Sequence, residues 1–134
     1  MANILLVDDD EAFRHMLSLA LKRIGHGVVE VPNGLTAWAK FQEHASDLVI
    51  MDLIMPEREC LETIRQFRRN GAKVKILAIS GGGRVDASNL LVVARQFGAD
   101  DILSKPFSID ELEAALNRLL LSKTEPQKTS EPQK

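Results

Sequence analysis

The feature that most constrains this chain is an apolar run that ends in a carboxylate. The residues at 48–51, Leu-Val-Ile-Met, are followed by Asp52 and, four positions later, by Pro56. A short, continuous apolar run bounded by turn residues is typical of a central strand covered on both faces of its sheet. In an open parallel sheet, ligands collect just beyond the carboxyl ends of the strands. Asp52 therefore stands where chemistry is expected.

Short apolar runs alternate with segments of helical periodicity along the rest of the chain. In the segments between and after these runs, apolar residues recur at helical spacing, and glycines follow three of the helices, at 25, 71 and 98. Five strands alternating with five helices predict an α/β domain with a parallel sheet and right-handed crossovers. The strands are expected at residues 4–7, 28–31, 47–51, 74–79 and 101–104.

The first and last helices have clear apolar stripes, which we expect to face inward. Asp10 favours the start of the first helix, where a negative charge suits the helix dipole. The last helix opens at Ser108, with Glu111 three residues on, which is the pattern of a capping box. The two stripes consist of Phe13, Met16, Leu17, Ala20, Leu21 and Ile24, and of Ile109, Leu112, Leu116, Leu119 and Leu120.

Composition narrows the class of protein. The chain has 134 residues, 45% of them hydrophobic and 27% charged, which is ordinary for one soluble globular domain. A net charge of -2 leaves no general basic surface for nucleic acid and no polybasic patch for a membrane. The single cysteine, Cys60, cannot form an internal disulfide, which suits the cytoplasm. From residue 122 the sequence lacks apolar residues, so 122–134 is expected to be a disordered tail.

Polar residues stand at the carboxyl ends of four predicted strands. The first strand is followed by Asp8 and Asp9, the third by Asp52, the fourth by Ser80 and the fifth by Lys105. Three carboxylates in one crevice repel one another, so either a pKa rises or a cation such as Mg²⁺ enters. An ammonium and a hydroxyl nearby supply what a phosphoryl group needs. The pattern predicts a carboxylate nucleophile that accepts a phosphoryl group with the help of a metal.

These motifs, taken in order, resemble the receiver domain of two-component response regulators. They are Val7-Asp8-Asp9, Asp52 to Pro56, Ser80 and Lys105-Pro106-Phe107. The resemblance covers about residues 3–121 and implies a receiver domain at 1–121. It also implies a flavodoxin-like, doubly wound (βα)5 fold whose five-stranded parallel sheet has the strand order 2-1-3-4-5.

The resemblance implies a role for each site residue. Asp52 would take a phosphoryl group from a phosphohistidine on a sensor histidine kinase or a histidine phosphotransfer protein. Mg²⁺ would be bound directly by Asp9 and Asp52, largely through water by Asp8, and by the backbone carbonyl of Ile54.

Two further residues would bind the phosphoryl group itself. Lys105 would pair with its oxygens, Ser80 would donate a hydrogen bond to it, and the Lys105–Pro106 peptide would be cis. Three features depart from the usual pattern, and one of them is the run of three glycines that follows Ser80. Ile102 replaces the aromatic residue whose rotamer reports phosphorylation in many receivers, and Cys60 stands where many carry glycine.

We therefore expect a stand-alone response regulator, a phosphoacceptor rather than an enzyme. It would present a phosphorylation-dependent surface, around the fourth helix, fifth strand and fifth helix, to an unknown downstream protein, or pass its phosphate on in a phosphorelay. Two alternatives stay open. One is a pseudo-receiver that binds partners without phosphate. The other is a haloacid-dehalogenase-type phosphatase with Asp8 as nucleophile and Asp10 as acid. The arginines at 65, 68 and 69 are expected to form a solvated helix face.

Overall fold

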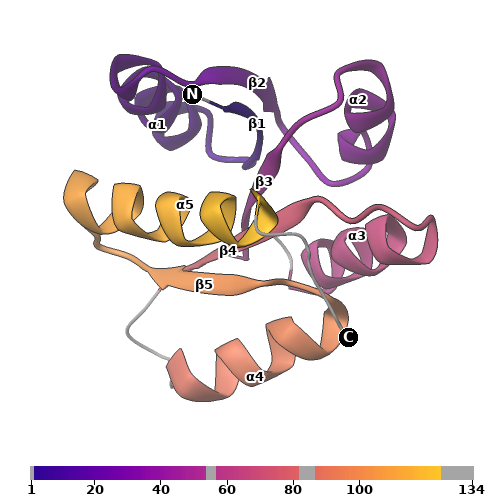
Figure 1. Ribbon diagram of the computed structural model, residues 1–134. Helices are drawn as coiled ribbons and strands as arrows, with labels where there is room; N and C mark the ends of the chain where they lie inside the picture. Colours follow the sequence, from indigo (N-terminus) through magenta and orange to yellow (C-terminus); the bar gives the residue numbers. More distant parts are fainter. Residues whose placement is uncertain (1, 54–56, 82–86, 125–134) are drawn as a thin grey trace.

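The fold is a parallel sheet between two layers of helices (Figure 1). The computed structural model describes residues 2–53, 57–81 and 87–124, with the backbone alone at 57–60, 87–91 and 122–124. The strands are β1 (Asn3–Val7), β2 (Gly27–Val31), β3 (Leu48–Asp52), β4 (Lys75–Ser80) and β5 (Asp101–Ser104). The helices are α1 (Glu11–Ile24), α2 (Ala37–Glu43), α3 (Glu57–Arg69), α4 (Ala87–Phe97) and α5 (Ile109–Thr124).

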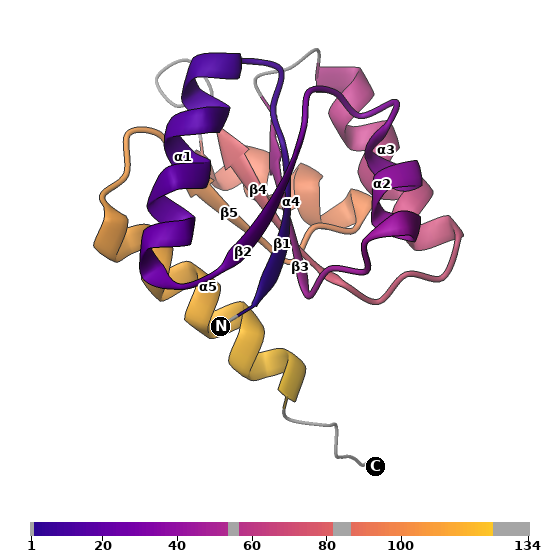
Figure 2. The same cartoon turned by 90° about the horizontal axis from the view of Figure 1, so that it is seen from above.

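The strands are parallel and lie in the order β2-β1-β3-β4-β5. This confirms the predicted flavodoxin-like topology. Helices α1 and α5 cover one face of the sheet, and α2, α3 and α4 cover the other (Figures 1 and 2). The carboxyl ends of the strands point toward the upper edge of Figure 2, where the candidate site lies.

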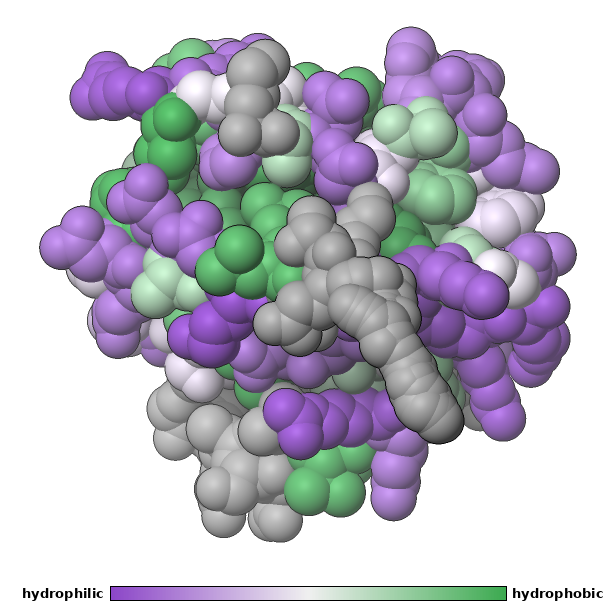
Figure 3. Space-filling view, viewed as in Figure 1, coloured by the Kyte–Doolittle hydropathy of each residue, from purple (hydrophilic) through white to green (hydrophobic). Residues whose placement is uncertain are grey.

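The distribution of hydrophilic side chains on the surface is as expected for helices that cover a buried sheet. On the face shown in Figure 3, hydrophilic side chains predominate, and hydrophobic ones come to the surface between them on the side of α1 and α5. Within residues 2–53, 57–81 and 87–124, no helix is both long and apolar enough to cross a membrane.

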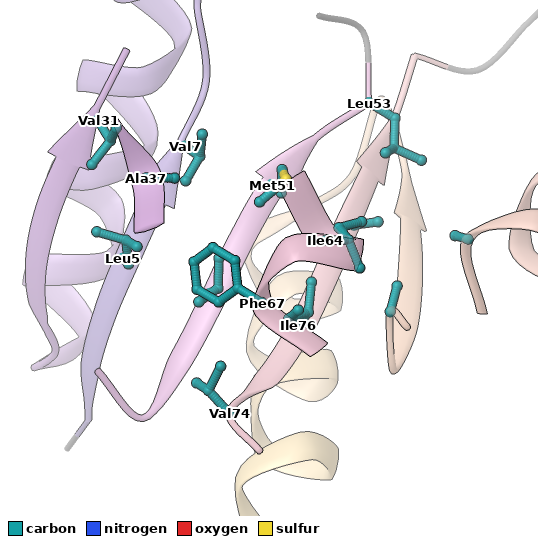
Figure 4. Packing of buried hydrophobic residues seen from close by; sticks show 14 residues of the cluster. Leu5, Val7, Val31, Ala37, Met51, Leu53, Ile64, Phe67, Val74 and Ile76 are labelled. Carbon is teal, nitrogen blue, oxygen red and sulfur yellow. The ribbon is translucent and has the colours of Figure 1, made fainter. Parts of the chain in front are cut away.

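Alternation along the strands divides the buried side chains into two clusters. On β1, Leu5 and Val7 pack toward α2, α3 and α4, whereas Ile4 and Leu6 pack toward α1 and α5. Every residue of β3 is buried, as predicted for a central strand. Phe67 of α3 lies over the sheet in the first cluster (Figure 4). Asp52 therefore ends a strand that is buried on both faces of the sheet.

Both predicted helix starts are confirmed. At α1, the Asp10 side chain accepts a hydrogen bond from the backbone N–H of Phe13 at 3.1 Å. At α5, Glu111 N–H donates to Ser108 Oγ at 3.0 Å, and Ser108 N–H donates to Glu111 Oε1 at 2.8 Å. This reciprocal pair is a capping box, and it fixes where the chain turns after Lys105-Pro106.

Two stripe residues were wrongly predicted to face inward. Met16 is 58% exposed and Ile109 is 47% exposed. The inward face of α1 is narrower than the six-residue stripe, because Leu17 and Leu21 already fill the space over the sheet. Met16 and Ile109 instead line a groove of about 340 Å³ between α1 and the start of α5. We call this the α1–α5 groove; its other lining residues are Phe13, Leu17, Ala20, Lys105, Pro106 and Phe107.

Arg68 was wrongly assigned to a solvated face. Its Nε donates to the carbonyl of Gly98 at 2.9 Å. Its Nη1 donates to the carbonyls of Ala72 and Val74 at 2.9 and 2.7 Å, and its Nη2 to Asp100 Oδ2 at 2.8 Å. The guanidinium thereby ties the ends of α3 and α4 to the amino ends of β4 and β5. Its planar fork suits several acceptors at once.

Candidate functional site

Strand register brings two carboxylates together at the carboxyl edge of the sheet. Val7 is paired with Met51 between β1 and β3, so the residues that follow them, Asp8 and Asp52, leave the sheet side by side. Asp8 is 1% exposed and Asp52 is 2% exposed. Burying two adjacent carboxylates costs free energy unless charge or hydrogen bonding compensates for it. The edge is therefore built at a cost to stability.

Lys105 supplies the positive charge beside the acceptor. Its Nζ donates to Asp52 Oδ2 at 3.2 Å, and its side chain is 19% exposed. Its backbone N–H donates to the carbonyl of Ser80 at 2.9 Å, which holds the end of β5 against β4. The Lys105–Pro106 peptide is cis, as the resemblance implied. The ammonium is thus directed over the carboxylate of Asp52.

Asp8 carries the electrostatic cost of the site. Burial raises the pKa of its carboxyl from 3.8 to about 7, and the neighbouring Asp52 carboxylate adds to the rise. The backbone N–H of Asp10, which donates to Asp8 Oδ1 at 2.9 Å, and the charge of Lys105 act in the opposite direction. Asp8 Oδ2 is buried and accepts no hydrogen bond from the N–H and hydroxyl groups that the structure describes. Such a group needs either a proton or a cation.

The two buried carboxylates fit a hard cation. Mg²⁺ favours one or two carboxylates and keeps several waters, and the unpaired Asp8 Oδ2 is an oxygen ligand of that kind. Asp9 is exposed, and Ile54 lies outside the described residues. In the described part of the chain, no three side chains from His, Cys, Asp and Glu are gathered as a ready metal cluster. The proposed ligand set of Asp8, Asp9, Asp52 and the Ile54 carbonyl stays a prediction.

Ser80 ends β4, the strand next to the acceptor strand β3, and Ile102 lies on β5, one strand further out. Ser80 is buried, and its Oγ donates to Ser104 Oγ, 3.1 Å away on the neighbouring strand. Ile102 is half-buried and packs against the cluster of side chains on the α2, α3 and α4 face. The side chain of Cys60 lies outside the described residues.

Two residues at the site were missed at the level of sequence. The ring of Phe13 lies under the Lys105 ammonium, with 3.7 Å from Nζ to the ring centroid. Arg14 Nη1 donates to the carbonyl of Asp8 at 2.9 Å, and its Nε donates to Glu30 Oε1 at 3.0 Å. The place of Phe13 on the apolar stripe predicts only packing against the sheet. Its position in the first turn of α1, directly after the acidic motif, could have indicated that its ring lies near the site.

Comparison with known proteins decides the family. The family model for the response regulator receiver domain matches residues 4–117. The chain belongs to the response regulator receiver family. The receiver is 34% identical over 122 residues to the chemotaxis protein CheY of Bacillus subtilis (strain 168), covering 90% of this chain and 99% of CheY.

Longer proteins match the receiver over part of their length. The DNA-binding transcriptional regulator NtrC of Azospirillum brasilense is 35% identical over 128 residues, covering 93% of this chain and 25% of NtrC. The chain therefore spans about a quarter of that relative. A solved Francisella receiver domain, response regulator 1452, superposes with a TM-score of 0.82 over 92% of this chain and 100% of its own, at 22% identity, which supports the fold.

Proposed function

We propose that this receiver accepts a phosphoryl group on Asp52 from a phosphohistidine and passes the signal on through protein contacts. The observation that carries the proposal is the buried Asp52 carboxylate held 3.2 Å from the Lys105 ammonium, with Asp8 beside it. Two acids and one ammonium in a buried edge leave a need for positive charge. A phosphoryl group arriving with Mg²⁺ would meet that need.

In the proposed reaction, a carboxylate oxygen of Asp52 attacks phosphorus and the N–P bond of the phosphohistidine breaks. The electron pair of that bond returns to the imidazole nitrogen, which takes up a proton. Lys105 neutralises charge on the phosphoryl oxygens as the transfer proceeds. Mg²⁺, which we predict is bound directly by Asp9, Asp52 and the Ile54 carbonyl and largely through water by Asp8, would supply further positive charge to the same oxygens.

The donor must approach over the rim of this edge. The α1–α5 groove opens there, with exposed Met16 and Ile109 beside Lys105. An apolar groove next to a charged acceptor suits a helical protein that carries the phosphohistidine, such as a sensor histidine kinase or a histidine phosphotransfer protein. We propose that this encounter takes place in the cytoplasm.

The phosphoryl group changes the partner of Ser80. In the structure its hydroxyl donates to Ser104 Oγ on β5 at 3.1 Å. Turning to a phosphoryl oxygen on Asp52 would break that link between β4 and β5. The change would then reach the surface around α4, β5 and α5 by movement of β5, because Ile102 offers no aromatic ring to switch. A stand-alone organisation and the domain limits 1–121 stay predictions. The predicted tail at 122–134 overlaps the helix, because α5 continues to Thr124.

The geometry disfavours a phosphatase based on Asp8 and Asp10. Asp10 Oδ1 accepts the Phe13 N–H at the start of α1, which occupies the proposed acid in helix capping. The ammonium of Lys105 lies at Asp52 rather than at either of those residues. A pseudo-receiver that never takes phosphate is disfavoured by the same pairing of Asp52 with Lys105.

The proposal is tested by intact mass after incubation with acetyl phosphate and Mg²⁺. We expect one phosphoryl adduct on the wild type, none on Asp52→Asn, and an undiminished adduct on Asp110→Asn, an exposed control in the first turn of α5. Chelation of Mg²⁺ should abolish the adduct. A wild type that stays unmodified where a control receiver is labelled would favour a phosphate-independent binding module, and sustained phosphate-ester hydrolysis by Asp52→Asn would favour the phosphatase.

A further inference from the structure

The Lys105 ammonium has an aromatic ring on one side. Its Nζ lies 3.7 Å from the centroid of the Phe13 ring, and 3.2 Å from Asp52 Oδ2. The face of a benzene ring is electronegative, so a cation over it is attracted by an amount that grows when water is excluded. With the lysine side chain only 19% exposed, the contact is partly withdrawn from solvent. The ammonium is therefore held between a carboxylate and a ring.

The ring itself is held in place. Phe107, two residues after Lys105, meets it edge to face, with centroids 6.4 Å apart and an angle of 84° between the planes. Phe13 also belongs to the capped first turn of α1, because its N–H is bound by Asp10. A fixed ring can restrain a flexible partner, and lysine, with its long stem, loses more rotamer freedom than most side chains when it is restrained.

We propose that Phe13 is a positioning residue, which uses its ring to hold Lys105 over the acceptor carboxylate and so sets the rate of phosphoryl transfer. This inference rests on the proposed function of Asp52. An ammonium already aligned with the acceptor can stabilise charge on the phosphoryl oxygens without first being ordered, and such preorganisation lowers the barrier of the transfer. Phe13 contacts Lys105 and acts through it.

An aliphatic side chain could fill the same space but would lack the electronegative face. Ordinary packing and cation–π positioning therefore predict different outcomes. Phe13→Tyr keeps an electron-rich ring. Phe13→Leu keeps apolar bulk only. Pentafluorophenylalanine at position 13 keeps nearly the shape of the ring but reverses the charge distribution on its face.

The experiment measures the initial rate of Asp52 phosphorylation by acetyl phosphate at saturating Mg²⁺, together with the melting temperature of each protein. We expect Phe13→Tyr to react at close to the wild-type rate. We expect Phe13→Leu and the pentafluorophenylalanine protein to react on the order of fivefold more slowly, as the loss of a partly desolvated cation–π contact predicts. Leu19→Met, at an exposed position of α1 outside the groove, should leave the rate unchanged. A pentafluorophenylalanine protein that reacts at the wild-type rate would overturn the inference.

A second readout does not depend on phosphorylation. Protons above the face of a ring are shielded, so the ε-methylene protons of Lys105 should resonate upfield of those of other lysines, and return to the ordinary position in Phe13→Leu. A wild-type spectrum without this shift would refute the contact. If the wild type takes no phosphoryl group and the shift is present, the proposed function fails while the Phe13–Lys105 contact is upheld. If phosphorylation occurs at equal rates in all variants, only the inference fails.

Discussion

Polar groups at the amino ends of β4 and β5 and at the carboxyl ends of β1 and β3 are arranged in opposite ways. At the amino end, the Arg68 guanidinium donates to three carbonyls and to Asp100 Oδ2, which also accepts the N–H of Ile76 at 2.8 Å. At the carboxyl end, Asp8 and Asp52 lie side by side, and the Lys105 ammonium is 3.2 Å from Asp52 Oδ2. One end pairs its charges, and the other brings like charges together.

The difference separates stability from function within one sheet. Buried polar groups stabilise a fold when each has a partner, and they cost free energy when one is left unpaired. Asp8 Oδ2 is such an atom among the residues that the structure describes, and the raised pKa of Asp8 is the sign of its cost. Perturbed pKa values of this kind gather at functional sites. The carboxyl end is therefore poised for a ligand that the amino end does not need.

We expect the largest effect on stability from substitution of Arg68, at the amino ends of β4 and β5. Arg68→Leu removes the guanidinium from three carbonyls and from the half-buried Asp100 carboxylate, which keeps the Ile76 N–H. We expect the free energy of unfolding to fall by about 3 kcal/mol. Urea denaturation measures it. Arg69→Leu, an exposed neighbour on α3, should change it by less than about 0.5 kcal/mol.

The Arg68→Leu variant also tests whether the two ends of the sheet are independent. Because Arg68 lies at the opposite end of the sheet from Asp52, the phosphorylation rate of folded Arg68→Leu should equal that of the wild type. A fall in that rate under conditions where the variant is fully folded would mean that the two ends are coupled rather than separate.

A smaller effect tests how closely Arg68 is packed. Gly98 and Gly25 both end helices with positive φ, at 121° and 114°, so alanine at either should cost about 1 kcal/mol of unfolding free energy. A Cβ at Gly98 would also lie 2.5 Å from Arg68 Cγ, whereas one at Gly25 has no neighbour within 4 Å. We expect Gly98→Ala to cost about 1 kcal/mol more than Gly25→Ala.

That excess should disappear when Arg68→Ala is the background, because the clashing Cγ is then gone. The measurement is the unfolding free energy, by heat or urea, of Gly98→Ala, of Arg68→Ala and of the variant that carries both. These three values and that of the wild type complete a double-mutant cycle. Equal losses for Gly98→Ala and Gly25→Ala in the wild-type background would contradict the described packing of the Arg68 side chain.

The sequence was sufficient for the sheet and for its charged edge, because both follow from local patterns. The apolar run before Asp52 predicts a strand buried on two faces, and parallel register then places Asp8 beside Asp52. The Ser108 and Glu111 capping box is local in the same way. Apolar runs and capping residues are local in the sequence, so predictions from them do not depend on how side chains from distant elements pack together.

The missed contacts join elements that are distant in the sequence. The partners of Arg68 include Gly98 and Asp100, which are about thirty residues away, and an arginine on a polar helix face gives no sign of them. Phe13 reaches Lys105 from another element, and its apolar type favours packing. The prediction that Met16 faces inward was wrong for a related reason. Helical periodicity indicates which side of α1 faces the sheet, but it does not indicate how wide the buried part of that side is.

The carboxyl end of the sheet holds two buried carboxylates against one ammonium, and we infer that this excess of negative charge is kept for a cation and a phosphoryl group. The most direct test is the free energy of unfolding of the wild type and of Asp8→Asn at pH 5 and pH 8, with and without Mg²⁺. The pKa of Asp8 is raised from 3.8 to about 7 in the folded protein, so the folded state holds a proton that the unfolded state has lost. Stability should therefore fall as pH rises between those two values.

Without Mg²⁺, we expect the wild type to lose about 3 kcal/mol of unfolding free energy between pH 5 and pH 8. Asp8→Asn should not show this loss, because it lacks the titrating carboxyl. Adding Mg²⁺ at pH 8 should restore the wild type, because the cation takes the place of the proton, and should have little effect on Asp8→Asn. The account would be contradicted if the two proteins showed the same pH dependence, or if Mg²⁺ stabilised both equally or neither.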